Sequence, residues 1–377
     1  MPLSIKRAAS SAIDPEVAVA ELHAAVAQPD AALVIFYCSS RYDLPALAAA
    51  LAARFGVDAP VIGCTTAAEI APTGYQEGSL TAVSLAGAGL AVAIERVDEL
   101  RAFELEHGAG AAGRARERLH AQGVTVDAGN TFAFLLSDGL AAQEEGLVSS
   151  IYAALGGIQL CGGSAGDGVR FGATHLYTRG EFRTDCAVLA LIHSPAPFRV
   201  FKTEHFVASS DRLVVTGADP GRRVVTEING EPAAVEYARI VGVPTDALTP
   251  LVFATHPVVV TLGGSVFVRS IQKVNPDGSL AFFCAIDEGI VLRVARGGDM
   301  VANLAEAFAA VEREIGPPAV VLGCDCVLRY LEVEQRQLRP AIDALLVRHN
   351  VVGFATYGEQ FNAMHVNQTF TGVAIGA

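Results

Sequence analysis

The chain has 377 residues, of which 51% are apolar and only 18% are charged, so its composition excludes a disordered protein and leaves room for sizeable cores. Its net charge is −13 with no basic block, which argues against nucleic acid as a partner because phosphates would be repelled. No apolar run approaches about 20 residues and no signal-peptide pattern opens the chain, so we expect a cytoplasmic protein with no membrane contact.

The first predicted elements form a strand–helix–strand unit. Residues 31–40 read as a buried strand, and residues 43–56 read as a helix with capping residues at both ends. The strand VIGCTTAAEI at 61–70 follows, then a polar loop, then another strand at 79–87. A helix of this length between two apolar strands predicts a parallel βαβ unit, whereas the direction of the last strand is left open.

The same order of elements recurs twice later in the chain. The second copy has its strand, helix, strand and last strand at 130–139, 141–157, 158–168 and 185–193. The third copy has them at 318–327, 333–349, 351–360 and 367–376. Pro340 lies within the last of these helices and indicates a kink or a later start. We therefore predict an α/β fold with mixed sheets, βαβ units flanked by helices, and three internal strand–helix–strand–strand repeats.

Each copy ends its second strand on a hydroxyl residue that is followed three residues later by an acid. The pairs are Thr66 with Glu69, Ser164 with Asp167, and Thr356 with Glu359. Ligands of open α/β sheets bind at the carboxyl ends of the strands, so the three hydroxyl residues are candidate binding residues. The same side chains could instead cap the local turns through hydrogen bonds to the backbone.

The pattern changes between the second and third copies. Residues 198–243 read as strands separated by tight turns and followed by a helix. More strands follow up to residue 298, and a longer helix at 299–316 leads into the third copy. We expect two domains, an N-terminal one at 25–215 and a C-terminal one at 216–377.

Four stretches of the sequence resemble the FIST family, whose members join an N-terminal FIST region to a C-terminal FIST-C region. These stretches are VIGCTTAAEI, GGSAGDG, EINGEPAAVEYARIVG, and GFATYGEQ with the closing HVNQTF. The resemblance runs from about residue 30 to the end of the chain. It implies a sensory protein that binds a small molecule and acts in signal transduction.

Three further stretches are similar to the nitric-oxide-sensing haemoproteins of this family, the NosP type. They are CSSRYDLPAL, GGSAGDGVRF and FRVFKTEHFV. This resemblance implies bound haem b, nitric oxide as its ligand, and regulation of a partner histidine kinase or of a diguanylate cyclase or phosphodiesterase of cyclic di-GMP. Other members are thought to bind small molecules such as amino acids, and a non-haem sensor of that kind is the alternative. A homodimer is left open.

A haem needs an axial ligand, and His205 is the best placed of the nine histidines. The residue lies in a strand-like run, and strand alternation would put Phe201 on the same face. Lys202 could meet a haem propionate. A hydrogen-bonded structural histidine is the other reading of His205, and His193, His256 and His365 are weaker candidates.

Arg41 and Tyr42 follow the first strand of the first copy and could reach a ligand at its carboxyl end. An arginine there suits a carboxylate or a propionate, although an ordinary surface arginine would look the same. Cys64 and Cys161 occupy strand-end turns where a nucleophile could sit, but no histidine is nearby in sequence and no catalytic motif is found. We therefore expect a binding protein and not an enzyme.

Overall fold

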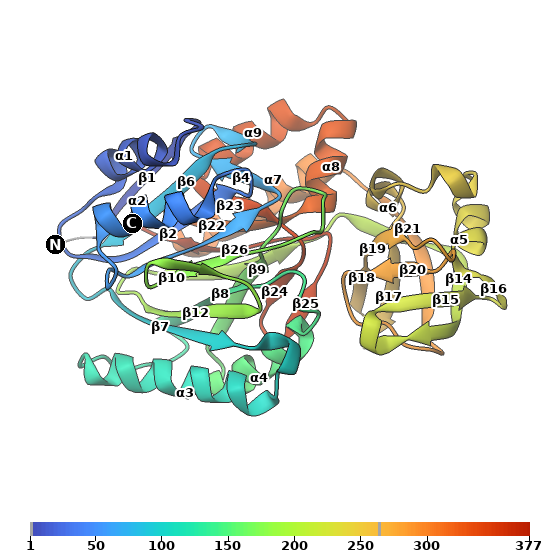
Figure 1. Cartoon of the computed structure of the whole chain (residues 1–377), viewed down its shortest axis with the longest axis horizontal. Helices are drawn as coiled ribbons and strands as arrows, with labels where there is room; N and C mark the ends of the chain where they lie inside the picture. The colour runs from blue at the N-terminus through green and yellow to red at the C-terminus, as the bar shows by residue number, and fades with distance from the viewer. Residues whose placement is uncertain (1–2, 263–264) are drawn as a thin grey trace.

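The computed structural model describes residues 3–262 and 265–377, and it consists of a large core and a smaller inserted domain (Figure 1). Four residues lie outside the described ones: Met1, Pro2, Gly263 and Gly264. The predictions for the start of the chain and for the middle strands included them. Within residues 3–262 and 265–377, no helix combines the length and the apolar character needed to cross a membrane.

The core contains three copies of one unit. The first consists of β1 (Ser4–Ser10), α1 (Pro15–Val26), β2 (Ala31–Ser39), α2 (Leu44–Phe55), β3 (Val61–Thr66), β4 (Ala68–Ala71), β5 (Gly74–Gln76) and β6 (Leu80–Ala86). The second consists of β7 (Ala91–Asp98), α3 (Leu105–Ala121), β8 (Thr131–Ser137), α4 (Glu144–Leu155), β9 (Gln159–Ser164), β10 (Leu176–Thr178), β11 (Glu181–Arg183) and β12 (Cys186–His193). The third consists of β13 (Phe198–Thr203), α7 (Met300–Ile315), β22 (Val320–Cys326), α8 (Val327–Gln335), α9 (Arg339–Arg348), β23 (Val351–Thr356), β24 (Glu359–Phe361), β25 (Met364–Val366) and β26 (Phe370–Ile375).

The predicted parallel pairs are confirmed in all three copies. β2 runs parallel to β3, β8 to β9, and β22 to β23. The last strand of each copy, whose direction the sequence left open, runs antiparallel to the first. Each repeat is also longer than predicted, because an edge strand and a helix precede it: β1 with α1, β7 with α3, and β13 with α7.

The segment predicted as a polar loop is a hairpin that leaves its own sheet. The β4–β5 hairpin of the first copy pairs with β23 of the third, and β10–β11 of the second pairs with β3 of the first. The β24–β25 hairpin of the third copy pairs with β9 of the second. Because every sheet is completed by a hairpin from another copy, the three sheets form a closed cycle.

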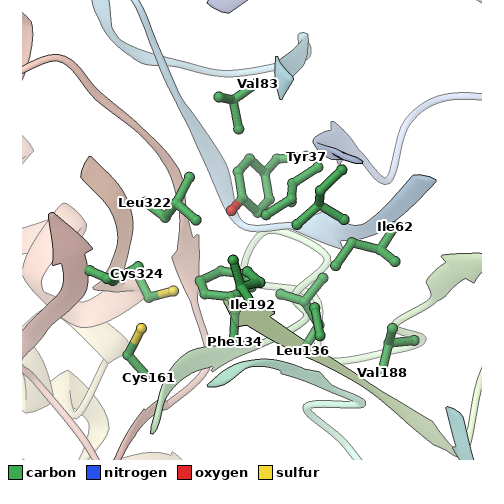
Figure 2. Packing of buried hydrophobic residues seen from close by; sticks show 14 of the residues in the cluster. Tyr37, Ile62, Val83, Phe134, Leu136, Cys161, Val188, Ile192, Leu322 and Cys324 are labelled. Carbon is green, nitrogen blue, oxygen red and sulfur yellow. The ribbon is translucent and has the colours of Figure 1, made fainter. Parts of the chain in front are cut away.

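The three sheets face one another across a central apolar core (Figure 2). Tyr37 of β2 stacks on Phe354 of β23 with ring centroids 4.8 Å apart, and both rings are fully buried. Phe134 of β8 and Leu322 of β22 enter the same cluster from the other sheets. Helices cover the outer faces of the sheets, so the strands are buried on both sides and read as continuous apolar runs.

Capping residues mark the start and the end of α2 where the sequence predicts them. The Asp43 side chain accepts a hydrogen bond from the Ala46 amide at 3.1 Å and begins α2, which stops at Gly56. The helix expected at 333–349 is two helices, because α8 begins earlier and Pro340 stands in the first turn of α9.

The inserted domain lies between β13 and α7 and carries one continuous sheet. It consists of β14 (Phe206–Asp219), β15 (Val224–Ile228), β16 (Glu231–Pro232), α5 (Ala233–Val241), α6 (Pro250–Thr255), β17 (Val258–Leu262), β18 (Ser265–Arg269), β19 (Ile271–Val274), β20 (Leu280–Phe282) and β21 (Val291–Gly297). Asn229 and Gly230 turn the chain between β15 and β16 with φ of 54° and 81°, as their sequence predicts. The division of the chain at residues 215 and 216 stays a prediction, and residues 320–375 fold back into the core.

The close approach of β22 and β23 can be tested by a substitution at Gly353. A Cβ at this position would overlap the backbone carbonyl oxygen of Gly323, which cannot move without breaking the parallel pair. We expect Gly353→Ala to lower the free energy of unfolding by roughly 3 kcal/mol or more in denaturant titrations. Gly113→Ala in α3, where a Cβ meets nothing within 4 Å, should be neutral or slightly stabilising. An equal loss in the two variants would contradict the packing argument.

Candidate functional site

The carboxyl ends of the three second strands meet at one end of the core. The turns that follow β3, β9 and β23 are joined to one another by backbone hydrogen bonds. These run from the amide of Ala67 to the carbonyl of Ala355, from Gly166 to Thr65, and from Tyr357 to Ser164, with N···O distances of 3.0, 2.9 and 3.2 Å. The sequence motif therefore marks the place where the three copies touch.

Two of the three predicted acids hold the start of the last strand in their own copy. Glu69 Oε2 accepts hydrogen bonds from the amide and the hydroxyl of Ser79 at 3.0 and 2.8 Å. Glu359 Oε2 accepts the same pair of bonds from Thr369 at 3.0 and 2.7 Å. Both acids are buried, and burial raises the pKa of Glu69 to about 7 and the pKa of Glu359 well above its ordinary value. This use is architectural.

Asp167, the third predicted acid, has a different partner set. Its carboxylate accepts backbone hydrogen bonds from Phe171, Gly172 and Ala173 at 2.9, 2.9 and 3.0 Å and a hydrogen bond from the Tyr357 hydroxyl. In this copy the start of the last strand is held instead by Asp138, which accepts from the amide of Asp185 at 2.6 Å.

The equivalence predicted for Ser164 needs a correction of one residue. Cys161 lies in the central core, whereas Leu160 packs under the outer helices α3 and α4. A Cβ at Gly163 would touch Phe354 and Thr356, so Gly163 faces the central core. Because strand side chains alternate between faces, Ser164 points outward and is not the counterpart of the threonines in the other copies.

Of the three predicted hydroxyl residues, Thr66 alone lines the cavity described below. Ser164 is fully buried, where its hydroxyl meets the Ser137 hydroxyl at 3.0 Å. The Thr356 hydroxyl is also fully buried and donates to the Ser164 carbonyl at 2.7 Å. The Thr66 hydroxyl bonds to Glu69 and to the Cys38 carbonyl.

A cavity of about 280 Å³ opens at these strand ends, and we call it the strand-end cavity. All three copies line it. The first copy contributes Ser39, Ser40, Arg41, Thr66, Ala67, Glu77 and Gly78, the second contributes Asp167, Gly168, Val169 and Arg170, and the third contributes Val327, Tyr330 and Leu331. Its position agrees with the rule that α/β sheets bind ligands beyond their strand carboxyl ends.

Two exposed arginines and one exposed glutamate carry charge in the strand-end cavity, whereas the Asp167 carboxylate, which also lines it, is buried and hydrogen-bonded. The Arg41 side chain is 72% exposed, and its guanidinium lies 3.8 Å from Glu77. Glu77 also accepts a hydrogen bond from the Tyr330 hydroxyl at 2.7 Å. Arg170 donates to the Ser40 hydroxyl at 2.6 Å and to the Asp167 carbonyl at 3.0 Å. The cavity thus presents two positive groups and one negative group to solvent.

Tyr42, which follows Arg41, does not line the strand-end cavity. Its ring is buried beneath α1 and α2, and its hydroxyl donates to the Ala12 carbonyl at 2.8 Å. Sequence reasoning missed Arg170, Glu77 and Tyr330, because they come from loops and a helix whose approach depends on the other copies. The position of Arg170, two residues after the GDG turn at the end of a strand, was the signal in the sequence that could have identified it.

His205 does not lie on a strand, so the alternation argument that paired it with Phe201 is wrong. β13 ends at Thr203, and His205 occupies the connection to the inserted domain. Phe201 packs in the core between Phe308 and Phe370, with centroid distances of 5.8 and 5.9 Å. Lys202 makes an ion pair with Glu204 at 2.8 Å.

Both ring nitrogens of His205 have partners. The Arg329 guanidinium donates to Nδ1 at 2.8 Å, so Nε2 carries the proton and donates to Glu332 Oε2 at 3.0 Å. Burial lowers the pKa of His205 below its ordinary value, in agreement with a neutral ring. Arg329 is itself buried and pairs with Asp325 at 2.6 Å. This arrangement does not fit an iron ligand, which needs a free ring nitrogen facing an apolar pocket.

The other candidates have simpler environments. His256 Nδ1 lies 3.0 Å from the Thr255 hydroxyl, and His365 is buried, which lowers its pKa below the ordinary value. Burial raises the pKa of the Cys64 and Cys161 thiols well above the ordinary value, so both remain protonated at neutral pH. Within residues 3–262 and 265–377, no three His, Cys, Asp or Glu side chains are grouped as metal ligands.

The described residues form a triplicated α/β core with a polar cavity at its strand ends and an inserted second domain. Family models match nearly the whole chain: a FIST N domain at residues 32–231 and a FIST C domain at residues 233–362. The chain belongs to the FIST family, whose domains are sensory and bind small molecules in signal transduction. No curated protein matches the sequence.

The buried carboxyl of Glu69 should make stability depend on pH. Its pKa is about 7 in the folded protein against 4.5 ordinarily, so the folded state holds this proton more tightly and the free energy of unfolding falls as the pH rises from about 5 to 8. Glu69→Gln should remove up to roughly 3 kcal/mol of that fall while keeping the bonds to Ser79. Urea titrations of both proteins at the two pH values measure it, and an unchanged pH dependence would contradict it. Part of the slope should remain in the variant because of Glu359.

Proposed function

We propose that the protein senses a small carboxylate ligand of the amino-acid type in the strand-end cavity and passes the signal to a partner protein. The observation that carries this proposal is the cavity itself, where Arg41, Arg170 and Glu77 gather at strand ends contributed by all three copies. Its volume of about 280 Å³ lies at the small end of ligand pockets and suits a molecule of that size.

The charges of the cavity match a zwitterion. Arg41 is exposed and only loosely held, so its guanidinium can turn to accept a carboxylate through two parallel hydrogen bonds. The Glu77 carboxylate, which accepts a hydrogen bond from the Tyr330 hydroxyl, offers an acceptor for an ammonium group. Val327 and Leu331 supply apolar surface for the rest of the ligand. A dianion would meet the carboxylates of Glu77 and Asp167 and is less suited.

The resemblance to the NosP type supports a second ligand, haem b, through which nitric oxide would be sensed. The surroundings of His205 do not fit that group as they stand, because Arg329 and Glu332 occupy both ring nitrogens and the ring does not line the strand-end cavity. The carboxylate proposal is therefore the one that the geometry supports best. The partner kinase or cyclic-di-GMP enzyme stays a prediction from the resemblance.

Ligand binding is tested by thermal unfolding in the presence of each of the 20 standard amino acids. We expect at least one to raise Tm by about 2 °C or more, because a ligand that binds only the folded state stabilises it. In Arg41→Ala the affinity for that amino acid should fall roughly tenfold or more through loss of the charged hydrogen bonds. Arg313→Ala, which removes an exposed arginine of similar pairing on α7, is the control. Absence of any shift across the set would contradict the proposal.

Haem binding at His205 is tested by absorbance. We expect protein reconstituted with haem to give the same visible spectrum in the wild type and in His205→Ala, since the ring nitrogens are already engaged. A Soret band in the wild type that shifts with nitric oxide and is lost in His205→Ala would contradict this expectation and support the NosP type.

A further inference from the structure

Two short segments join the inserted domain to the core, and they lie side by side. Residues 204–206 lead out of β13, and residues 297–299 lead back into α7; together we call them the hinge. The Gly298 amide donates to the His205 carbonyl at 2.7 Å, and Phe206 pairs with Gly297. His205 therefore marks the point where the chain leaves and re-enters the core.

Helix α8 touches both the strand-end cavity and the hinge. Tyr330 and Leu331 line the cavity. Their neighbours in sequence, Arg329 and Glu332, bind the two ring nitrogens of His205 at 2.8 and 3.0 Å. A displacement of this nine-residue helix at the cavity would therefore act directly on the hinge.

The same helix also packs on the inserted domain. Leu328 lies in an apolar cluster with Ala254 of α6 and with Phe283, which follows β20. Figure 1 shows α8 at the side of the core that faces this domain. Cavity, hinge and inserted domain are thus connected through one rigid element, so no long chain of side-chain contacts is needed between them.

The surface that the inserted domain covers on the core contains buried polar atoms without partners. Among the residues that the structure describes, neither amide atom of Asn367 has a hydrogen-bond partner, and the Gln368 carbonyl oxygen also lacks one. Gln368 donates to the Phe253 carbonyl of the inserted domain at 3.1 Å, and His365 lies near Arg223. Such atoms would be hydrated if the domain moved away, which lowers the cost of leaving the docked position.

Arg223 holds the docked position. Its guanidinium donates to Glu144 at 2.7 Å and also to Glu145, and both acids stand in the first turn of α4 in the core. Glu145 in turn accepts from the Ala285 amide at 2.6 Å. A few charged contacts thus oppose the unpaired polar atoms, which is the balance expected of a junction with two arrangements.

We propose that α8 transmits occupancy of the strand-end cavity to the inserted domain, which moves about the hinge at His205. This regulation rests on the proposed function, because the cavity must be the sensing site. The Tyr330 hydroxyl bonds to Glu77 at 2.7 Å and ties α8 to the first copy. A ligand ammonium that engages Glu77 competes for this bond, so the two positions of α8 bind the ligand with different affinity.

The test fills the cavity covalently, without the natural ligand. Ser40→Cys places a half-buried thiol in the cavity, whereas the seven native cysteines are all buried, so N-ethylmaleimide should modify position 40 alone. Hydrogen exchange of the full chain, read by mass spectrometry, should be about threefold faster or more in peptides covering the hinge and residues 365–368 after modification. Ala121→Cys at the exposed end of α3, modified in the same way, should leave these peptides unchanged.

A second substitution distinguishes transmission through α8, which we call the relay, from a general loosening of the protein. In Ser40→Cys, the further change His205→Ala should abolish the effect of modification at the hinge; if that protein does not fold, Glu332→Gln should reduce it. Unchanged hinge exchange on modification, or an effect of full size in the second variants, would overturn the relay. Failure of every amino acid to bind while the adduct still acts would remove the proposed function and leave the relay standing.

Discussion

The exchange of hairpins among the three copies is the constraint on which the rest of the structure depends. Each sheet ends in a hairpin that belongs to a different copy, so none of the three can be completed until all are present. The exchange also brings the three strand-end turns within backbone hydrogen-bonding distance of one another. The strand-end cavity exists only because these turns meet, so it belongs to the three copies together and not to one unit.

Buried polar groups at this end of the core serve two different purposes. Glu69 and Glu359 each accept a hydrogen bond from the buried backbone amide at the start of a last strand, and burial raises the pKa of both acids. Arg329 instead joins Asp325 of β22 to His205 of the hinge. Such a network favours one arrangement strongly when complete, because a charge left unpaired in the interior is costly. The first group fixes the architecture, and the second connects the core to the inserted domain.

The inserted domain gives the family's two sequence regions a structural meaning. The match to the FIST C domain begins at residue 233, inside the insertion, and ends at residue 362, inside the third copy of the core. The two family regions are therefore not two independent folding units, since the third sheet combines β13 from before the insertion with β22 and β23 from after it. The inserted domain is thus joined to the core by two adjacent segments, residues 204–206 and 297–299.

The sequence by itself determined the local features. Apolar runs, capping residues such as Asp43 and Gly56, and the turn at Asn229 and Gly230 act within a few residues. These features predicted the parallel pairs, the helices α2, α4 and α7, and the hairpin correctly. Arg41 and Thr66, which were predicted because they follow strands of an α/β sheet, line the strand-end cavity.

Only the tertiary structure decided which strands from distant copies pair, because hairpin exchange leaves no trace in local periodicity. It placed Ala165, and not Ser164, at the core-facing position equivalent to Thr66 and Thr356, since a shift of one residue reverses the face of a strand and the offset pattern does not reveal it. It also showed that both ring nitrogens of His205 are hydrogen-bonded to Arg329 and Glu332, which are more than 120 residues away in the chain. The partners of a buried polar side chain depend on the whole fold, and they decide whether that side chain is free to bind a ligand.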